Sequence, residues 1–427
     1  MAVGTRPSLR GTKAKGLRRG GFSQIYPEPR RARERARQAA QGLCGLFGEG
    51  EFRLFSAPGR TELGGNHTDH NQGLGLAAAV GADILAAARP VDEPVVRLHS
   101  KGYYTDVIDL TDLSPREGER CHSASLIRGI AAGLRSAGFC IGGFDAFTVS
   151  DVPRGAGVSS SAAFEVLTAS IFNGLYNGGE IGPLTIARIA QEAENRYFGK
   201  PCGLLDPFAC SAGGCVALDF QKPADPLVCR LPVRFEEWGI CLCVVNTGGR
   251  HTDFTAEFAE CRQEMEAVAR LLGGETLRDV PRERFEEAIP ALRRSAGDRA
   301  VLRALHFYEE NERVEKQCAA LQSGDAGAFL RQVTASGRSS QNLLQNVSIP
   351  GMPREQGIAL ALALTERELG DEGAWRVHGG GFAGTIQAYV PKARLASYRE
   401  VMERVFGPSC LHVLSVREAG GAELVEE

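Results

Sequence analysis

The feature that most constrains the fold is a glycine- and serine-rich turn, "DVPRGAGVSSSAAFEVL" at 151–167, which joins a strand pattern to a helix pattern. Glycine permits positive φ and close approach to a ligand, and the free amides of a helix N-terminus attract anions. Strand, glycine turn and helix in this order predict a phosphate-binding loop in a mixed α and β protein. An ordinary helix cap is the competing interpretation, because serine is a favoured N-cap residue.

Two widespread nucleotide-binding motifs are absent from this chain. The turn lacks the G-x-x-x-x-G-K-[ST] pattern of a P-loop, and no G-x-G-x-x-G opens a helix after the first strand. The phosphate-binding candidates are therefore the residues of the turn itself, namely Gly155, Ala156, Gly157, Val158, Ser159, Ser160 and Ser161.

Hydrophobic periodicity predicts both helices and strands along the chain. The first are a helix at 30–48 and a strand at 51–59 that ends at a Pro-Gly stop. Further strands are expected at 82–90, 95–100, 106–110, 144–150 and 239–247, and further helices at 123–136, 159–175, 184–198, 255–272, 298–322 and 353–369. The stretch 374–390 is expected to form strand, glycine loop and strand.

Length and composition bound the domain organisation. A chain of 427 residues favours two or three packed units, and the Pro-containing connector at 221–232 is the expected seam. Residues 1–37 contain eleven Lys or Arg and only two acidic residues. We expect a disordered basic tail at 1–22, an N-terminal domain at 23–222 and a C-terminal domain at 223–427. A transit peptide stays an alternative for the tail.

Composition also limits the kinds of binding partner that the chain is expected to have. A net charge of −3 favours neither nucleic acid nor a membrane surface, and the apolar run at 74–88 is shorter than the ~20 residues of a membrane span. The twelve cysteines include no C-x-x-C pair, which predicts reduced thiols in a cytoplasmic protein. The sequence carries no signal for an oligomeric state.

A second segment, "GRTELGGNHTDHNQG" at 59–73, is unusually rich in reactive side chains. His67, Asp69 and His70 are all potential zinc ligands, but Gly65 stands where an H-x-H-x-D-H metal motif needs another histidine. Residues 66–68 also match the N-x-[ST] glycosylation pattern, which a reduced cytoplasmic chain does not use. Neither interpretation accounts for the whole segment.

Taken together, these segments resemble the GHMP kinase superfamily. The turn "P-x-G-x-G-V-S-S-S-A-A" resembles its nucleotide-binding signature, and "HGGGFAGTIQAYV" at 378–390 its third motif. Within the superfamily, "APGRTELGGNHTDHNQG" is similar to the galactokinase signature, and 191–208, 246–251 and 306–321 resemble galactokinase stretches in the proper order. The resemblance implies an α+β fold with a ribosomal-S5-like N-terminal domain, a ferredoxin-like C-terminal domain and an active site in the cleft between them.

The resemblance also implies catalytic roles. Asp206 would orient or deprotonate the attacking hydroxyl, and Arg60 would offset negative charge at the transferred phosphate. Ser161, or its neighbour Ser160, and Glu194 would hold Mg²⁺ beside the co-substrate ATP. The competing interpretations are a helix N-cap for Asp206 and a solvated helix carboxylate for Glu194.

A monosaccharide is the implied second substrate. Asn66, His67, Asp69, Gly203 and Phe258 occupy the positions that would bind it. His67 and Asp69 are expected on one side of an extended strand, where both would reach neighbouring hydroxyls.

Four positions depart from the galactokinase pattern. Galactokinases usually carry Glu at Asn66, Tyr at His70, Gln at Pro207 and Tyr at Phe258. The expected function is phosphorylation of galactose to galactose 1-phosphate. A kinase for a uronic acid, a pentose or an N-acetylhexosamine, or a sugar sensor with weak turnover, stays an alternative.

Overall fold

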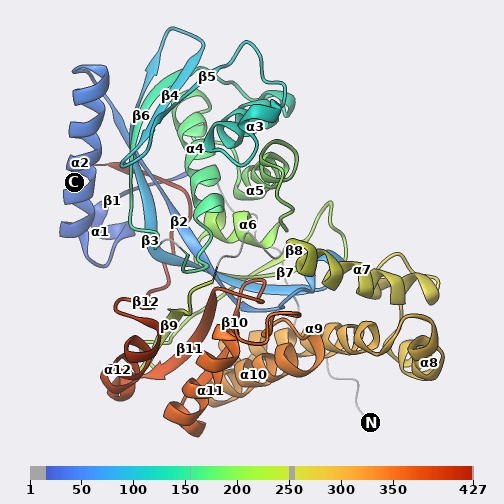
Figure 1. Cartoon of the computed structure of the whole chain (residues 1–427). Coiled ribbons are helices and arrows are strands. Elements are labelled where there is room, and N and C mark those ends of the chain that lie inside the picture. Colours follow the sequence, from blue (N-terminus) through green and yellow to red (C-terminus); the bar gives the residue numbers. More distant parts are fainter. Residues whose placement is uncertain (1–15, 154, 250–254, 426–427) are drawn as a thin grey trace.

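The computed structural model describes residues 16–153, 155–249 and 255–425, in which helices pack on two β-sheets (Figure 1). The strands are β1 (Arg18–Gly21), β2 (Arg53–Gly64), β3 (Leu74–Val91), β4 (Val95–Ser100), β5 (Thr105–Asp109), β6 (Gly143–Ser150), β7 (Cys215–Asp219), β8 (Leu227–Leu231), β9 (Ile240–Asn246), β10 (Ala374–His378), β11 (Thr385–Pro391), β12 (Leu411–Leu414) and β13 (Ala422–Val425).

The helices lie mostly on the faces of these sheets. The α-helices are α1 (Phe22–Ile25), α2 (Pro29–Phe47), α3 (Ser123–Ser136), α4 (Ser160–Tyr176), α5 (Pro183–Glu192), α6 (Leu205–Ala212), α7 (Thr255–Leu271), α8 (Arg282–Ser295), α9 (Asp298–Ser323), α10 (Ala326–Ser339), α11 (Gly357–Leu369) and α12 (Leu395–Phe406). Short π-helices, η3 (Ala193–Phe198) and η6 (Ser340–Leu344), extend α5 and α10, and the 3-10 turns are η1 (Asp69–Asn71), η2 (Glu117–Glu119), η5 (Leu277–Asp279), η7 (Gly370–Glu372) and η8 (Lys392–Arg394).

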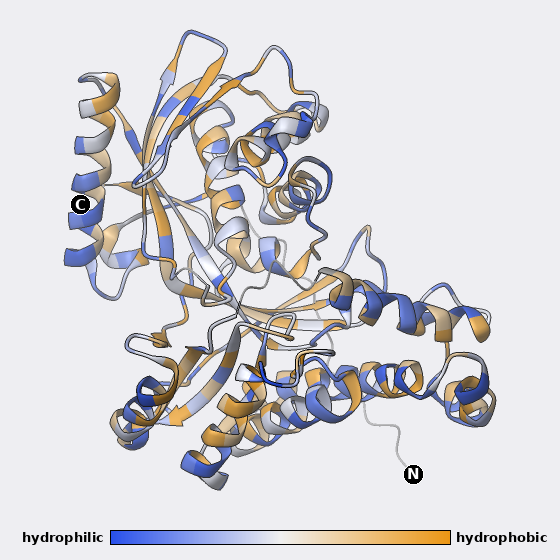
Figure 2. Cartoon of the chain, viewed as in Figure 1, coloured by the Kyte–Doolittle hydropathy of each residue, from blue (hydrophilic) through white to orange (hydrophobic). Residues whose placement is uncertain are grey.

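The larger sheet has the order β1-β13-β2-β3-β6-β4-β5, and β7 continues from β3 to β8. The smaller sheet is antiparallel with the order β10-β11-β9-β12. Helix α2 covers one face of the larger sheet and α4 packs against β2 and β3 on the other (Figure 1). Along α2, apolar and polar residues alternate in Figure 2, and the buried positions Ala32, Ala36, Ala39 and Leu43 face the sheet.

The chain does not divide between the sheets at residue 222. Strands β8 and β13, both predicted within the C-terminal domain, belong to the larger sheet, and β13 lies between β1 and β2. The predicted disordered tail lies outside the described residues up to residue 15. The prediction is wrong for Arg18–Gly21, because the backbone of β1 pairs with β13 and needs no apolar side chains for this. The division into 23–222 and 223–427 otherwise stays a prediction.

Strand β2 does not end at the predicted Pro-Gly stop. It continues to Gly64 through a register shift between Pro58 and Arg60, the kind of irregularity that tolerates proline within a sheet. A Cβ on Gly59 would lie 2.5 Å from the carbonyl oxygen of Val158. Glycine at 59 therefore lets the glycine- and serine-rich turn touch β2, which places Arg60 beside that turn.

The structure also defines the state of the cysteines and the character of the helices. All twelve cysteines are free thiols. Among the residues described, no helix combines the length and apolar character that crossing a membrane requires.

A buried ion cluster ties the C-terminal segment to the larger sheet. The carboxylate of Asp83, fully buried on β3, accepts hydrogen bonds from Tyr26 at 2.6 Å and Arg417 at 2.7 Å and pairs with Arg35. Burial alone would raise the pKa of Asp83, but the two guanidinium groups lower it below its ordinary value. The carboxylate is therefore ionised in the interior and depends on both arginines.

We expect Arg417→Met to lower the free energy of unfolding by about 3–5 kcal/mol, because it leaves a buried carboxylate with only one cationic partner. Urea denaturation at pH 7 measures the change. The control Arg338→Met removes an exposed pair with Glu366 and should leave stability nearly unchanged. Equal stability of the two variants would contradict a structural role for the cluster.

Candidate active site

The glycine- and serine-rich turn lies between β6 and α4, and its backbone explains its composition. Gly155 and Gly157 have φ of 70° and 69°, in the left-handed region. A Cβ on Gly157 would lie 2.6 Å from Thr385 Oγ1, so glycine lets the turn approach β11. Ser159 precedes α4 but makes no capping hydrogen bond to it. The interpretation of the turn as an ordinary serine cap is therefore wrong for Ser159.

Arg60 and Asp206 meet at this turn, although 146 positions separate them in sequence. Arg60 Nε donates to Asp206 Oδ1 at 2.6 Å, Arg60 Nη2 pairs with Asp206 Oδ2, and Arg60 Nη1 donates to Gly157 O at 2.7 Å. Ser159 Oγ donates to Asp206 Oδ2 at 2.8 Å. Asp206 lies in the first turn of α6 with its oxygens on Arg60 and Ser159, so the N-cap interpretation is wrong.

The charge state of this pair follows from its surroundings. Burial by itself would raise the pKa of Asp206, but Arg60 and Ser159 hold it below its ordinary value. The Arg60 side chain is 8% exposed and that of Asp206 33%. Asp206 is thus an ionised carboxylate with one side open, as a group that meets a substrate hydroxyl requires.

A second carboxylate lies on the other side of the turn. Glu194, in the π-helix η3, accepts a hydrogen bond from Ser161 Oγ at 3.0 Å on Oε1, and Lys200 Nζ lies 3.2 Å from the same oxygen. The Glu194 side chain is only 3% exposed. The interpretation of Glu194 as a solvated helix carboxylate is therefore wrong.

The residues at this place fit a magnesium ion. Mg²⁺ prefers hard oxygen ligands and completes its shell with water and phosphate oxygens, so one hydroxyl and one carboxylate suffice. Glu165, one helical turn after Ser161, is fully buried, and neither of its oxygens has a hydrogen-bond partner. Burial and then the charge of Glu194 raise its pKa well above the ordinary value. The raised pKa favours the neutral, protonated form of Glu165, so the carboxylate that faces Ser161 is that of Glu194.

The segment after β2 carries His67 and Asp69, but not on an extended strand as predicted. His67 has φ of 56° in the turn, and Asp69 begins η1. The prediction failed because Gly65, with φ of 86°, turns the chain immediately after β2. His67 Nε2 lies 2.8 Å from Gly380 O, and its ring meets that of His70 edge to face. In the described part of the chain, no group of three or more His, Cys, Asp or Glu is placed to hold a metal ion.

Asp69 points towards Gly203, in the loop that precedes α6. A Cβ on Gly203 would lie 1.9 Å from Asp69 Oδ2, so the carboxylate rests directly on the glycine backbone. Burial, and to a smaller degree Asp206, raise the pKa of Asp69 above its ordinary value. The structure therefore brings Asp69, Gly203 and Asp206 together.

Asn66 is buried and committed to contacts within the protein. Its Nδ2 donates to Gly379 O at 2.7 Å and to Glu62 Oε1 at 3.1 Å, and its Oδ1 accepts from Asn346 Nδ2 at 2.8 Å. These bonds use both ends of the side-chain amide to join β2, the glycine loop 379–384 and the segment that follows η6. Direct sugar binding by Asn66 stays a prediction.

Phe258, on α7, lies against His67 with nearly parallel rings whose centroids are 6.3 Å apart. It also packs edge to face on Phe382, and a Cβ on Gly380 would meet its ring at 2.4 Å. The structure thus places Phe258 with the predicted sugar residues and the glycine loop.

Sequence reasoning missed the buried polar face of α9 that supports this segment. Glu310 Oε1 accepts from Gly65 N at 3.1 Å, Asn311 Oδ1 accepts from Leu74 N at 2.6 Å, and Gln317 Nε2 donates to Leu63 O at 3.0 Å. The available signal was polar residues recurring at helical spacing in "HFYEENERVEKQ".

His306, on the same face, links the segment to α10. Its Nε2 lies 2.9 Å from Asn66 O and its Nδ1 2.9 Å from Ser339 Oγ. A carbonyl oxygen only accepts, so Nε2 carries the proton and Nδ1 accepts from the serine. Burial, the largest effect, lowers the pKa of His306 to about 4.

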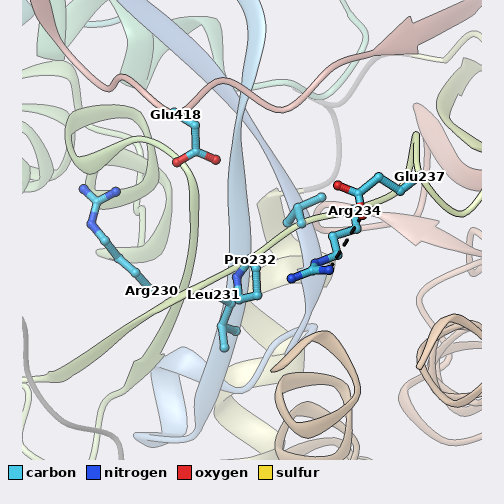
Figure 3. Close-up of a pocket in the computed structure, with 7 residues that line it drawn as sticks. Arg230, Leu231, Pro232, Arg234, Glu237 and Glu418 are labelled. Atoms are coloured by element: carbon cyan, nitrogen blue, oxygen red, sulfur yellow. Dashed lines mark ion pairs between the residues drawn. The ribbon is translucent and has the colours of Figure 1, made fainter. Parts of the chain in front are cut away.

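A hollow elsewhere on the surface is separate from these residues. It is lined by Arg230, Arg234, Glu237 and Glu418, with Arg234 and Glu237 paired at 3.7 Å (Figure 3). None of the predicted site residues lines it.

We expect acid to weaken the fold through His306. Its folded-state pKa of about 4 lies below the ordinary ~6.5, so its contribution is complete above pH ~6.5 and is lost as the pH falls towards 4. The full loss is on the order of 3 kcal/mol. Urea denaturation of wild type and His306→Gln at pH 7 and pH 5 tests this, since glutamine does not titrate. The variant should lose less stability between the two pH values, and an equal loss would contradict the assignment.

Comparison with known proteins supports the kinase interpretation. Residues 125–214 match the family model "GHMP kinases N terminal domain" and residues 45–90 the "Galactokinase galactose-binding signature". Among solved structures, the Lactococcus lactis galactokinase complexed with galactose has a TM-score of 0.76 at 23% identity, covering 91% of this chain and 99% of that one. The Methanococcus jannaschii mevalonate kinase has a TM-score of 0.61 at 14% identity, covering 86% and 99%. These likenesses show the GHMP kinase fold.

Two relatives are similar over nearly their whole length. A galactokinase of Streptomyces coelicolor is 35% identical over 381 residues, which are 88% of this chain and 94% of the relative. A galactokinase of Streptomyces lividans is 33% identical over 391 residues, 89% and 92% of the two chains. The chain therefore belongs to the galactokinase family of GHMP kinases.

Proposed function

We propose that this protein transfers the γ-phosphoryl group of ATP to the anomeric hydroxyl of galactose. The observation that carries the proposal is the Arg60–Asp206 pair, which contacts the glycine- and serine-rich turn through Gly157 and Ser159. A bond forms between the sugar oxygen and the γ-phosphorus, and the bond to the β–γ bridging oxygen breaks. The hydroxyl proton leaves, and the products are galactose 1-phosphate and ADP.

Asp206 receives or directs that proton. Its lowered pKa makes it a weak base in the ground state, so its first task is to accept a hydrogen bond from the attacking hydroxyl and hold it in line. Arg60 fixes the carboxylate through two donors, as a bidentate pair does. Phosphoryl transfer depends mainly on such positioning and on charge stabilisation.

The remaining groups are assigned by position. Asp69 and His67 would hydrogen-bond sugar hydroxyls, and the backbone of Gly203 would form the wall beside them. Ser161 and Glu194 would hold Mg²⁺, which supplies charge neutralisation at the phosphates when bound. We propose a cytoplasmic location, in keeping with the free thiols.

A related kinase with another sugar is the second candidate. The side-chain amide of Asn66 is hydrogen-bonded within the protein, and the Phe258 side chain has no hydroxyl. These two positions therefore supply fewer polar contacts to a sugar than a carboxylate and a tyrosine would. A uronic acid, a pentose or an N-acetylhexosamine would suit a pocket altered in this way. A sensor without turnover is disfavoured, because Arg60, Asp206 and Glu194 are all present and in contact with the turn.

A coupled assay of ADP release across a panel of monosaccharides tests the function. We expect the highest kcat/KM for galactose, because a site built to bond hydroxyls rejects epimers that leave its polar groups unpaired. Preference for another sugar would support the second candidate. Tight galactose binding without ADP release would support the sensor.

We expect Asp206→Asn to lower kcat by roughly 10²–10⁴-fold, since it keeps the shape but removes the charge that receives the proton. ATP affinity, measured by calorimetry, should change little. The matched control Asp219→Asn alters a carboxylate paired with Arg278 at 2.9 Å, outside the site residues, and should keep normal kcat. A near-normal kcat for Asp206→Asn would refute the assigned role.

A further inference from the structure

The loop between η3 and α6 holds a cation that the mechanism above does not use. Lys200 follows Gly199, whose φ of 87° ends the π-helix. The amides of Gly199 and Lys200 both donate to the carbonyl oxygen of Glu194, at 2.9 and 3.1 Å. The backbone of Lys200 is thus anchored to the residue that faces Ser161.

The side chain of Lys200 is held loosely by comparison. Its Nζ lies 3.2 Å from Glu194 Oε1, yet the lysine side chain is 62% exposed while that of Glu194 is 3% exposed. A lysine ammonium on a four-carbon stem can change partners without moving the backbone. Glu194 is therefore a fixed carboxylate, and Lys200 is a cation able to leave it.

The guanidinium of Arg60 already has partners within the protein. Its Nε and Nη2 bond Asp206, and its Nη1 bonds Gly157 O. The charge of its guanidinium is balanced by Asp206, and turning it towards a phosphate would break the contact that orients the carboxylate. A second cation that is free to change partners would add to the charge stabilisation that Arg60 can give the transferred phosphate.

The charges around Lys200 place it at the same centre. Glu194, its ion-pair partner, bonds Ser161 in the turn. Lys200 Nζ is thus joined through the Glu194 carboxylate to Ser161, the residue proposed to lie beside the phosphates and the magnesium ion.

We propose that Lys200 is a further catalytic residue, whose ammonium leaves Glu194 and contacts the γ-phosphate of ATP during phosphoryl transfer. This inference rests on the proposed kinase function. Glu194 is also the proposed magnesium ligand, so the ammonium gives up that carboxylate when the nucleotide binds with its metal ion. A lysine acting as a point charge on a phosphate needs no bidentate geometry and tolerates this exchange of partners.

The test compares ATP with ADP, because only ATP has the γ-phosphate. Dissociation constants of both nucleotides with Mg²⁺ are measured by calorimetry, without sugar, for wild type, Lys200→Met and Lys200→Arg. We expect Lys200→Met to bind ATP about 10-fold or more weakly, the range for a hydrogen bond to a charged group, with ADP affinity unchanged within about 2-fold. Lys200→Arg should recover most of the ATP affinity. The control Lys222→Met changes an exposed lysine in the turn between β7 and β8 and should match wild type.

The outcomes separate this inference from the proposed function. An equal loss of ATP and ADP affinity, or no loss of either, overturns the inference and leaves Lys200 as a structural partner of Glu194. Wild-type protein that turns over no galactose overturns the proposed function, but the difference between ATP and ADP would still hold. Melting temperatures within a few degrees of wild type show that the exposed Lys200 side chain was not needed for folding.

Discussion

The irregular segment that follows β2 is anchored by the buried polar face of helix α9. Residues 65–73 lie between two strands but form no ladder, so their buried N–H and C=O groups bond within the segment or to other elements. Helix α9 contributes Glu310, which accepts from Gly65 N at 3.1 Å, and His306, which bonds Asn66 O at 2.9 Å, while Asn311 accepts from Leu74 N at the start of β3. Arg313 in turn holds Glu310, and with the other nearby cations it keeps the pKa of that carboxylate at about 2 against the effect of burial. This polar face therefore fixes the backbone at Gly65 and Asn66, directly before His67.

Hydrogen bonds and ion pairs between distant chain segments also hold the catalytic centre together. Two acidic side chains there each contact two chain segments: Asp206 contacts Arg60 and Ser159, and Glu194 contacts Ser161 and Lys200. Buried charges are stable only when paired and hydrogen-bonded, so these contacts align β2, the turn before α4 and the loop before α6 in one arrangement. The positions of the reactive groups thus follow from the electrostatics that keep the interior neutral.

Short motifs made much of the site predictable. Glycine and serine chemistry alone left a phosphate cradle and a helix cap as equal interpretations of the turn at 155–161, and family resemblance paired the turn with Arg60 and Asp206, which the structure brings into contact with it. The helix and strand order was largely predictable from periodicity. The extended conformation expected for His67 and Asp69 was wrong, because a single left-handed glycine at 65 reverses the chain. The role of α9 was not predicted, since a buried polar face looks solvent-exposed in sequence until the segment it serves is known.

The pairing of strands from distant parts of the chain could not be predicted from the sequence either. Strand β13 joins β1 to β2 through backbone bonds whose register no local pattern encodes. This placement has a consequence for biosynthesis. The larger sheet stays open between β1 and β2 until residues 422–425 have left the ribosome, so this sheet cannot be completed before β13 is available. A chain cut short near residue 420 would expose the edge of β2, which chaperones and proteases could then recognise.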